Sequence, residues 1–284
     1  MVAILFPPRN RGMSVADVDY VAGITDFLTP LNFQVLIWPQ DSNELKQLAK
    51  LTSHGIVDGV IAMEVREVDH RIPILESSGV PYCLIGRPGN LRPHTFVDAD
   101  FEAFGNLAIS HLTERGHRQI GVIALSEKHT PELFRPIIPI EAGAVREAIQ
   151  PGIYLHFQHV GDKASDGRLA VSRLLTDHPE ITALVGLNPN AMQGGLSELT
   201  ARSFQIPGDM SVISFGLWER EAANTVPEQS TIGVDGYALG KKAAEFLMAR
   251  IEKTTDEQLV HLEVPRLVDR GSTARARTIR DFSG

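Results

Sequence analysis

The residues best suited to bind a small polar molecule lie where short apolar runs end. The run "ALVGLN" (183–188) leads through Pro189 into a segment with helical periodicity. In open α/β sheets, ligands bind beyond the carboxyl ends of the strands, at strand-to-helix corners of this kind. Guanidinium, amide and indole groups at such corners supply hydrogen bonds and stacking. This pattern selects as ligand-binding candidates Arg9, Arg11, Arg87, Asn188 and Trp218.

The proline in the corner "NPN" (188–190) offers a ligand no N–H group. Its fixed φ and missing donor suit the first turn of a helix. We therefore expect Pro189 to stiffen the corner, and Asn188 to be the residue that contacts a ligand.

The histidines do not form a pattern typical of catalysis or of metal binding. His111 and His117 are six residues apart, whereas a helical metal pair needs a spacing of four. His117 follows a helix-ending glycine and precedes a strand, so we expect it to bond backbone carbonyls. His156 and His159 fall on opposite faces of one strand. Ser272 lies in a polar terminal segment and is a poor nucleophile candidate. From these patterns we expect that the protein is not an enzyme and binds neither a metal nor a cofactor.

Composition restricts the class of protein further. The chain has 284 residues, 43% of them hydrophobic, and a formal net charge of -8. No apolar run is long enough to cross a membrane, and the start does not read as a signal peptide. Binding nucleic acid without help would need clustered Lys and Arg, which are missing. Cys83 is the single cysteine, so an internal disulfide is excluded and a reducing cytoplasm is expected.

Apolar runs and amphipathic stretches alternate along the whole chain, which predicts βαβ units and parallel sheets. The runs are too numerous for one sheet. We therefore predict an α/β protein of two doubly wound parallel-sheet lobes, joined by several crossover strands and with a cleft between them. The stretch 98–116 is predicted to be a helix with Asp98 as its N-cap, and 126–141 to be a loop because of its three prolines.

Several motifs in order give the chain a resemblance to a known family. They are "FVDADFEAFGNLAISHLTERGHRQIGVI" (96–123), "ALVGLNPNAMQGGLSELTARSFQIPGDMSVISFG" (183–216), "STIGVDGYALGKKAAEFLMARI" (230–251) and "LVDRGST" (267–273). In these segments the sequence resembles the effector-binding core of LacI/GalR bacterial transcriptional regulators. The first half agrees more loosely, through "VDGVI" and "GVPYCLIGR".

The resemblance implies the type I periplasmic-binding-protein fold, with three crossovers near residues 97, 233 and 258. It thus implies an N-terminal lobe of 1–97 plus 234–257 and a C-terminal lobe of 98–233 plus 258–284. It also implies a cytoplasmic homodimer in which an effector closes the cleft and alters DNA binding. The family's helix-turn-helix headpiece should precede the first strand. This sequence opens with that strand, so the headpiece is expected either to have been truncated or to be naturally absent. Operator binding is expected only through such a headpiece, outside these residues.

The family's sugar-contacting positions have changed here. Gly86 and Gly216 stand where the family carries acidic residues, and its arginine aligns with Ile140, five residues after Arg135. Asn188 persists. Losing two carboxylates and one guanidinium removes bidentate contacts to hydroxyls. We therefore expect an anionic or less hydroxylated effector rather than an ordinary hexose, or a vestigial site. The ligand-binding set is completed by Arg135 and Asp235.

The leading interpretation is the ligand-sensing, dimerising core of a LacI-type regulator. The alternative from another class is the solute-binding protein of a sugar or small-molecule uptake system, which shares the fold. An enzyme using the cleft ranks third. An upstream helix-turn-helix would favour the regulator, and a signal peptide would favour transport.

Overall fold

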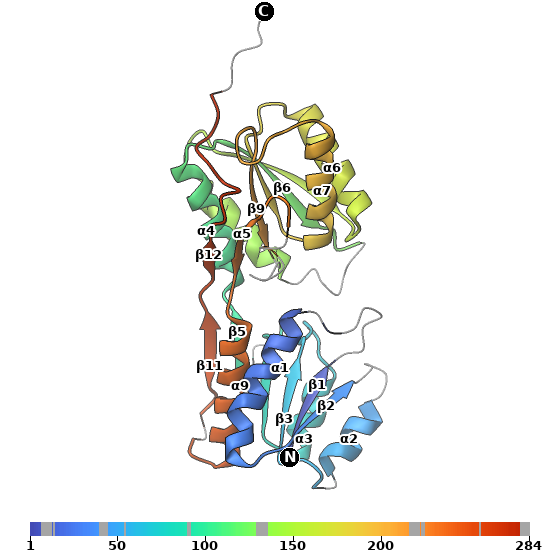
Figure 1. The fold of residues 1–284 in the computed structure, drawn as a ribbon. Helices are drawn as coiled ribbons and strands as arrows, with labels where there is room; N and C mark the ends of the chain where they lie inside the picture. Colours follow the sequence, from blue (N-terminus) through green and yellow to red (C-terminus); the bar gives the residue numbers. More distant parts are fainter. Residues whose placement is uncertain are drawn as a thin grey trace, which may run out of the picture. The chain divides into compact units, whose positions relative to one another are not determined.

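In the structure, a computed structural model, the chain forms two compact units. Each unit is built from two separate segments of the sequence. It describes residues 1–6, 13, 15–39, 45–53, 55–89, 92–128, 136–215, 222, 225–255 and 257–278. Unit 1 consists of Met1–Ala99 and Val234–Glu263, and unit 2 of Asp100–Gly233 and Val264–Gly284. Each unit contains one six-stranded sheet with helices beside it (Figure 1). The predicted α/β fold of two doubly wound sheets is confirmed.

The sheet of unit 1 is parallel throughout, in the order β11-β5-β4-β3-β1-β2. Every residue of its inner strands β1 and β3 is buried, which explains why both read as continuous apolar runs. The strands are β1 (Val2–Phe6), β2 (Val35–Pro39), β3 (Gly59–Met63), β4 (Tyr82–Ile85), β5 (Phe96–Ala99) and β11 (Val260–Glu263).

Helices cover both faces of this sheet, because successive side chains of β1 point to opposite sides. Val2 and Ile4 pack with α1 (Val15–Leu28) and α9 (Gly236–Ile251). Ala3 and Leu5 pack with α2 (Leu45–Ser53) and α3 (Arg71–Ser78). A short 3₁₀ helix, η1 (Thr29–Leu31), follows α1. Among the described residues, no helix has both the length and the apolar character needed to cross a membrane.

The sheet of unit 2 has the order β12-β10-β9-β8-β6-β7 and is parallel except at one edge. There β12, which the sequence pattern does not predict, runs antiparallel to β10. Its three residues are too few to show a periodicity. The strands are β6 (Gln119–Leu125), β7 (Tyr154–Val160), β8 (Ala183–Gly186), β9 (Ser211–Phe215), β10 (Ser230–Gly233) and β12 (Arg266–Val268).

Two helix pairs flank the second sheet. The pair α6 (Ala164–Asp177) and α7 (Pro189–Ala201) packs on one core cluster, which includes Leu174 and Leu199. The pair α4 (Phe101–Glu114) and α5 (Ile137–Glu147) lies against the other face. There the rings of Phe104 and Phe215 meet edge to face, with their centroids 5.8 Å apart. Both helix pairs are therefore fixed by buried apolar surface.

Paired glycines let the helices of three pairs approach each other closely. A Cβ on Gly23 of α1 would overlap the carbonyl oxygen of Tyr237 in α9, and a Cβ on Gly240 would overlap that of Tyr20. Each glycine thus faces a backbone carbonyl group of the partner helix. That carbonyl belongs to the residue three positions before the partner helix's own glycine. The same reciprocal arrangement joins α4 to α5 and α6 to α7, through Gly105 with Gly143 and Gly167 with Gly194. Such backbone contacts require residues without side chains.

Two local predictions are wrong. Asp98 lies in β5, and it is Asp100 that caps α4 by accepting a hydrogen bond from the Ala103 N–H at 3.2 Å. Pairing of β5 with both β4 and β11 keeps this segment extended through Ala99. In the stretch expected to be a loop, α5 already begins at Ile137, with Pro136 as its N-cap. Proline is tolerated at a helix start because the first N–H groups have no partner within the helix.

The chain passes between the two units at three points. The chain leaves unit 1 after Ala99, returns at Val234 and leaves again after Glu263. The resemblance implies crossovers near 97, 233 and 258 and assigns 258–284 to the C-terminal lobe. Residues 260–263 instead belong to unit 1, because β11 pairs with β5 along its whole length.

Candidate functional site

Asn188 stands at the carboxyl end of β8, where α7 begins. Its side-chain Oδ1 accepts a hydrogen bond from the Ala191 N–H at 2.8 Å, which makes Asn188 the N-cap of α7. Pro189 occupies the first helical position, as predicted. Asn188 is only 6% exposed, and its Nδ2 group donates to no partner in the described part of the chain. The amide therefore retains two unused donors at the edge where ligands bind.

In unit 1, the corresponding edge carries acceptor groups that the sequence pattern does not single out. Asp98, near the end of β5, accepts a hydrogen bond from the Arg87 N–H through Oδ2 at 3.1 Å. Burial raises the pKa of Tyr20 in α1, and the negative charges of Asp98 and Asp17 raise it further. A phenol and nearby carboxylates therefore gather beside the carboxyl ends of these strands, while the Arg87 side chain is exposed.

The glycine at position 86 is required by the backbone of this corner. Gly86 has a φ of 111°, a conformation that residues with side chains rarely adopt. A Cβ at this position would also lie 3.2 Å from the Cβ of Val65. An acidic side chain here would therefore be strained, whereas Asp98 supplies a carboxylate at this edge.

A buried ion pair shapes the loop that follows β3. Arg71 donates to both carboxylate oxygens of Asp69, the shortest contact being Nη2 to Oδ2 at 2.7 Å. The same guanidinium group donates to the carbonyl oxygens of Met63 and Glu64. Burial alone would raise the pKa of Asp69, but the hydrogen bonds and charge of Arg71 outweigh it and lower the pKa. These contacts hold the loop at the carboxyl edge of the unit 1 sheet.

Other predicted ligand-binding residues have different positions. Asp235 is the N-cap of α9, and its Oδ1 accepts a hydrogen bond from the Ala238 N–H at 3.0 Å. Ile140, at the position of the family's arginine, is 4% exposed and packs in α5. The next residue, Glu141, contacts Nε2 of His159 at 2.9 Å, near the carboxyl end of β7. The remaining candidates lie outside the described residues: Arg9, Arg11, Arg135 and Trp218.

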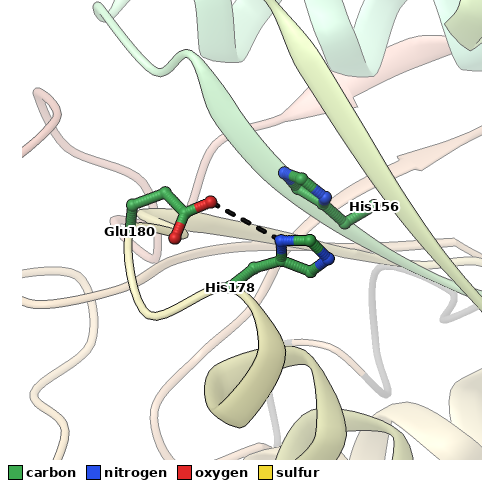
Figure 2. Close-up of side chains that lie close together, drawn as sticks. All are labelled: His156, His178 and Glu180. Atoms are coloured by element: carbon green, nitrogen blue, oxygen red, sulfur yellow. Dashed lines mark ion pairs between the residues drawn. The ribbon is translucent and has the colours of Figure 1, made fainter.

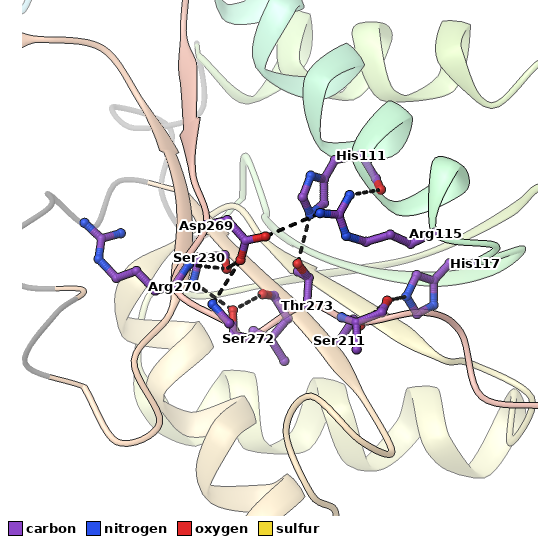
Figure 3. A network of polar contacts seen from close by, with 12 residues as sticks. His111, Arg115, His117, Ser211, Ser230, Asp269, Arg270, Ser272 and Thr273 are labelled. Atoms are coloured by element: carbon purple, nitrogen blue, oxygen red, sulfur yellow. Dashed lines mark hydrogen bonds and ion pairs between the residues drawn. The ribbon is translucent and has the colours of Figure 1, made fainter.

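At the opposite, amino-terminal edge of the unit 2 sheet, polar residues form a structural network (Figure 3). His117 is 1% exposed and contacts Oγ1 of Thr182 at 2.8 Å and the carbonyl oxygen of Ala274 at 3.1 Å. The expectation that it bonds a backbone carbonyl is confirmed. The Ser272 hydroxyl donates to the Val212 carbonyl and accepts from the Ser230 N–H. Neither residue is placed to act on a substrate.

The comparisons with known proteins agree with this architecture. The family described as the periplasmic binding protein-like domain matches residues 109–273, more than half of the chain. The chain belongs to this family. Together with the relatives below, the match shows that it carries the effector-binding core of a LacI-type regulator.

Two transcriptional regulators are similar to this chain in sequence. The chain is 29% identical over 238 residues to the HTH-type transcriptional repressor PurR of Haemophilus influenzae, covering 81% of this chain and 67% of that protein. It is 26% identical over 244 residues to the HTH-type transcriptional regulator CelR of Thermobifida fusca, covering 84% and 70%.

Solved structures of LacI-type proteins show the same fold. The complex of the transcriptional regulator CelR with cellobiose matches with a TM-score of 0.80 at 22% identity, over 95% of this chain and 84% of that one. A LacI family regulator from Enterococcus faecium with bound ribose matches with a TM-score of 0.78 at 23% identity, over 97% and 99%. At these identities the likeness extends to the fold alone.

Proposed function

We propose that this chain is the ligand-sensing and dimerising part of a transcriptional regulator whose effector is a small polar metabolite. The membership of the LacI-type family supports the regulatory role. The relatives named above are regulators, which does not favour the alternative of a solute-binding protein for uptake. The proposal places the protein in the cytoplasm, where a headpiece outside these residues would meet operator DNA. It assigns the chain no catalytic role.

The unused amide donors of Asn188 carry the proposal for the ligand site. They lie at the carboxyl end of a parallel strand and are held in place because Oδ1 caps α7. A donor fixed in this way loses little conformational entropy on binding. We propose that Asn188 donates to an oxygen of the effector, and that Arg9, Arg11, Arg135, Trp218 and Asp235 complete the set of contacting residues.

Two classes of effector are supported by different groups of unit 1. The exposed guanidinium of Arg87 suits a carboxylate or phosphate, the anionic class. Asp98 and the phenol of Tyr20 are hydrogen-bond acceptors that suit the hydroxyls of a sugar-like molecule. Gly86 and Ile140 leave fewer bidentate contacts than a hexose site has, so we favour an anionic or sparsely hydroxylated ligand.

Titration calorimetry of the 284-residue chain tests both the site and the class. The panel contains a neutral pentose, a hexose, a disaccharide, a sugar phosphate and a hydroxycarboxylate. Asn188→Asp keeps the helix cap but replaces the donors by an acceptor, and it should weaken binding about tenfold or more. Asn190→Ala, an exposed neighbour in α7, is the matched control and should bind as the parent does.

The outcomes separate the parts of the proposal. Tight one-to-one binding of a neutral hexose would contradict the effector class but leave the site in place. Binding that is unchanged in Asn188→Asp would contradict the site. Light scattering coupled to gel filtration tests dimerisation, and a monomer at micromolar concentration would contradict that part.

A further inference from the structure

Two histidines and a glutamate from different parts of unit 2 lie together away from the edge that carries Asn188. His156 belongs to β7, His178 is the C-cap of α6, and Glu180 follows in the turn before β8 (Figure 2). One ligand atom from each residue lies within 4.8 Å of the others. His156 is the third residue of its strand, and Glu180 precedes the start of β8. The cluster therefore lies at the amino-terminal edge of the sheet.

The spacing of these groups is close to that of a metal centre. The ring centroids of His156 and His178 are 3.7 Å apart, and His178 Nδ1 lies 3.5 Å from Glu180 Oε1. Tetrahedral zinc binds nitrogen and oxygen ligands at about 2.0–2.2 Å, which puts neighbouring ligand atoms roughly 3.3 Å apart. The three ligand atoms, all within 4.8 Å of one another, lie close to that spacing. All three residues are half-buried, so an ion can reach them from solvent.

The backbone and one neighbouring side chain hold the cluster in this arrangement. The Ile181 N–H donates to the His178 carbonyl at 3.1 Å, which closes a turn with Pro179 at its second position. The turn fixes where His178 and Glu180 leave the chain. Across the strand pair, Oε1 of Gln119 lies 2.8 Å from Nε2 of His156 and orients that ring. Ligands held in place before the ion arrives lose little entropy when it binds.

We propose that His156, His178 and Glu180 bind a divalent transition-metal ion of the zinc class, with water completing the coordination. Imidazole nitrogens with one carboxylate favour zinc over magnesium or calcium, which take oxygen ligands. The binding would tie edge strand β7 to the end of α6 and the start of β8.

Calorimetric titration of ZnCl₂ into the full chain, prepared without a histidine tag, tests the site. We expect one zinc ion per chain. His156→Gln and His178→Gln should each weaken binding at least about tenfold, because even groups that only support a ligand typically contribute 10–100-fold. His159→Gln, which removes an exposed histidine three residues along the same strand, is the matched control and should change the Kd less than twofold. MgCl₂ should give no comparable binding.

Cobalt gives an independent readout on the parent protein, should a variant fail to fold. CoCl₂ should produce the strong visible bands of tetrahedral Co²⁺, and one equivalent of ZnCl₂ should abolish them. Zinc binding weaker than about 100 μM would overturn the proposal. Affinity unchanged in both cluster variants would also overturn it, because the ion would then sit on other histidines. Neither outcome bears on effector binding at Asn188.

Discussion

Asn188 Oδ1 accepts a hydrogen bond from the Ala191 N–H at 2.8 Å, so the residue expected to contact a ligand also starts helix α7. One side chain thus serves two purposes through its two polar atoms. The oxygen satisfies an N–H group that the helix cannot pair, while the nitrogen remains available. Stability and ligand binding can therefore be separated by substitution at this position.

Asn188→Ala should lower the free energy of unfolding by about 1 kcal/mol, because the cap is lost. Asn188→Asp should keep most of the stability, since a carboxylate is also an N-cap acceptor. Urea denaturation followed by circular dichroism measures both. The control Asn190→Ala removes an exposed side chain of the same helix and should be neutral. Equal stability of Asn188→Ala and Asn190→Ala would show that the cap contributes nothing.

His117→Ala should destabilise unit 2 by about 2–3 kcal/mol, because Thr182 and the Ala274 carbonyl lose their partner in a buried site. The imidazole joins the end of α4 to the C-terminal segment, so its loss should also free that segment. Thermal unfolding measures the first effect, and proteolysis near residue 274 measures the second. His159→Ala, at an exposed position, should leave both unchanged.

Stability should fall as the solution is acidified through pH 6.5. Burial lowers the pKa of His94, His111 and His117 below the usual imidazole value of 6.5. The unfolded chain therefore binds protons first, so stability is complete above pH 6.5 and declines toward the lower folded-state pKa values. Urea midpoints measured between pH 8 and pH 5 test this. His117→Gln should show a shallower decline than the parent, and a flat profile in the parent would contradict the prediction.

Arg71→Ala should destabilise unit 1 by about 3–5 kcal/mol, because the Asp69 carboxylate stays buried without its partner. Arg71→Lys should recover only part of this loss, since an ammonium group cannot reproduce the forked contacts. Arg66→Ala removes an exposed arginine of the same loop and is the control. In a double-mutant cycle, Arg71→Ala with Asp69→Ala should cost less than the sum of the single changes. Strict additivity would indicate that the pair is not coupled.

Gly194→Ala should destabilise unit 2 by about 1–3 kcal/mol, because the added methyl group would overlap the Ala164 carbonyl and push α6 from α7. The control is Gly208→Ala, whose Cβ would lie 3.7 Å from its nearest neighbour. Chemical denaturation compares the two. A neutral Gly194→Ala would mean that the helices can separate without loss of packing.

Much of the fold follows from the sequence, because buried parallel strands and amphipathic helices each have a clear periodicity. The pattern fails where local signals compete. In "DAD" (98–100) both aspartates are good helix caps, and only the pairing of β5 with distant β11 decides that Asp100 is used. β12 is missed because three residues are too short to show alternation.

The site is less predictable than the fold, because its contacts join residues far apart in sequence. Asn188 and Pro189 could be placed at their corner, since a strand, a cap and a proline are all local signals. The approach of His178 to His156 depends on how α6 ends beside β7, and no spacing in the sequence shows it. The role of Asp98 at the strand edge likewise depends on its contact with the Arg87 backbone.

The close contact of α1 with α9 limits when unit 1 can fold while the chain is being synthesised. Gly23 and Tyr237 meet across helices whose segments are separated by the continuous stretch 100–233. At about 5–20 residues per second, a ribosome needs roughly ten seconds or more to reach α9. During that interval the apolar face of α1, with Ile24 and Leu28, lacks the part of its cover that α9 supplies. Unit 1 therefore emerges first but cannot close until α9 and β11 have been made, and a newborn chain is most prone to aggregate there.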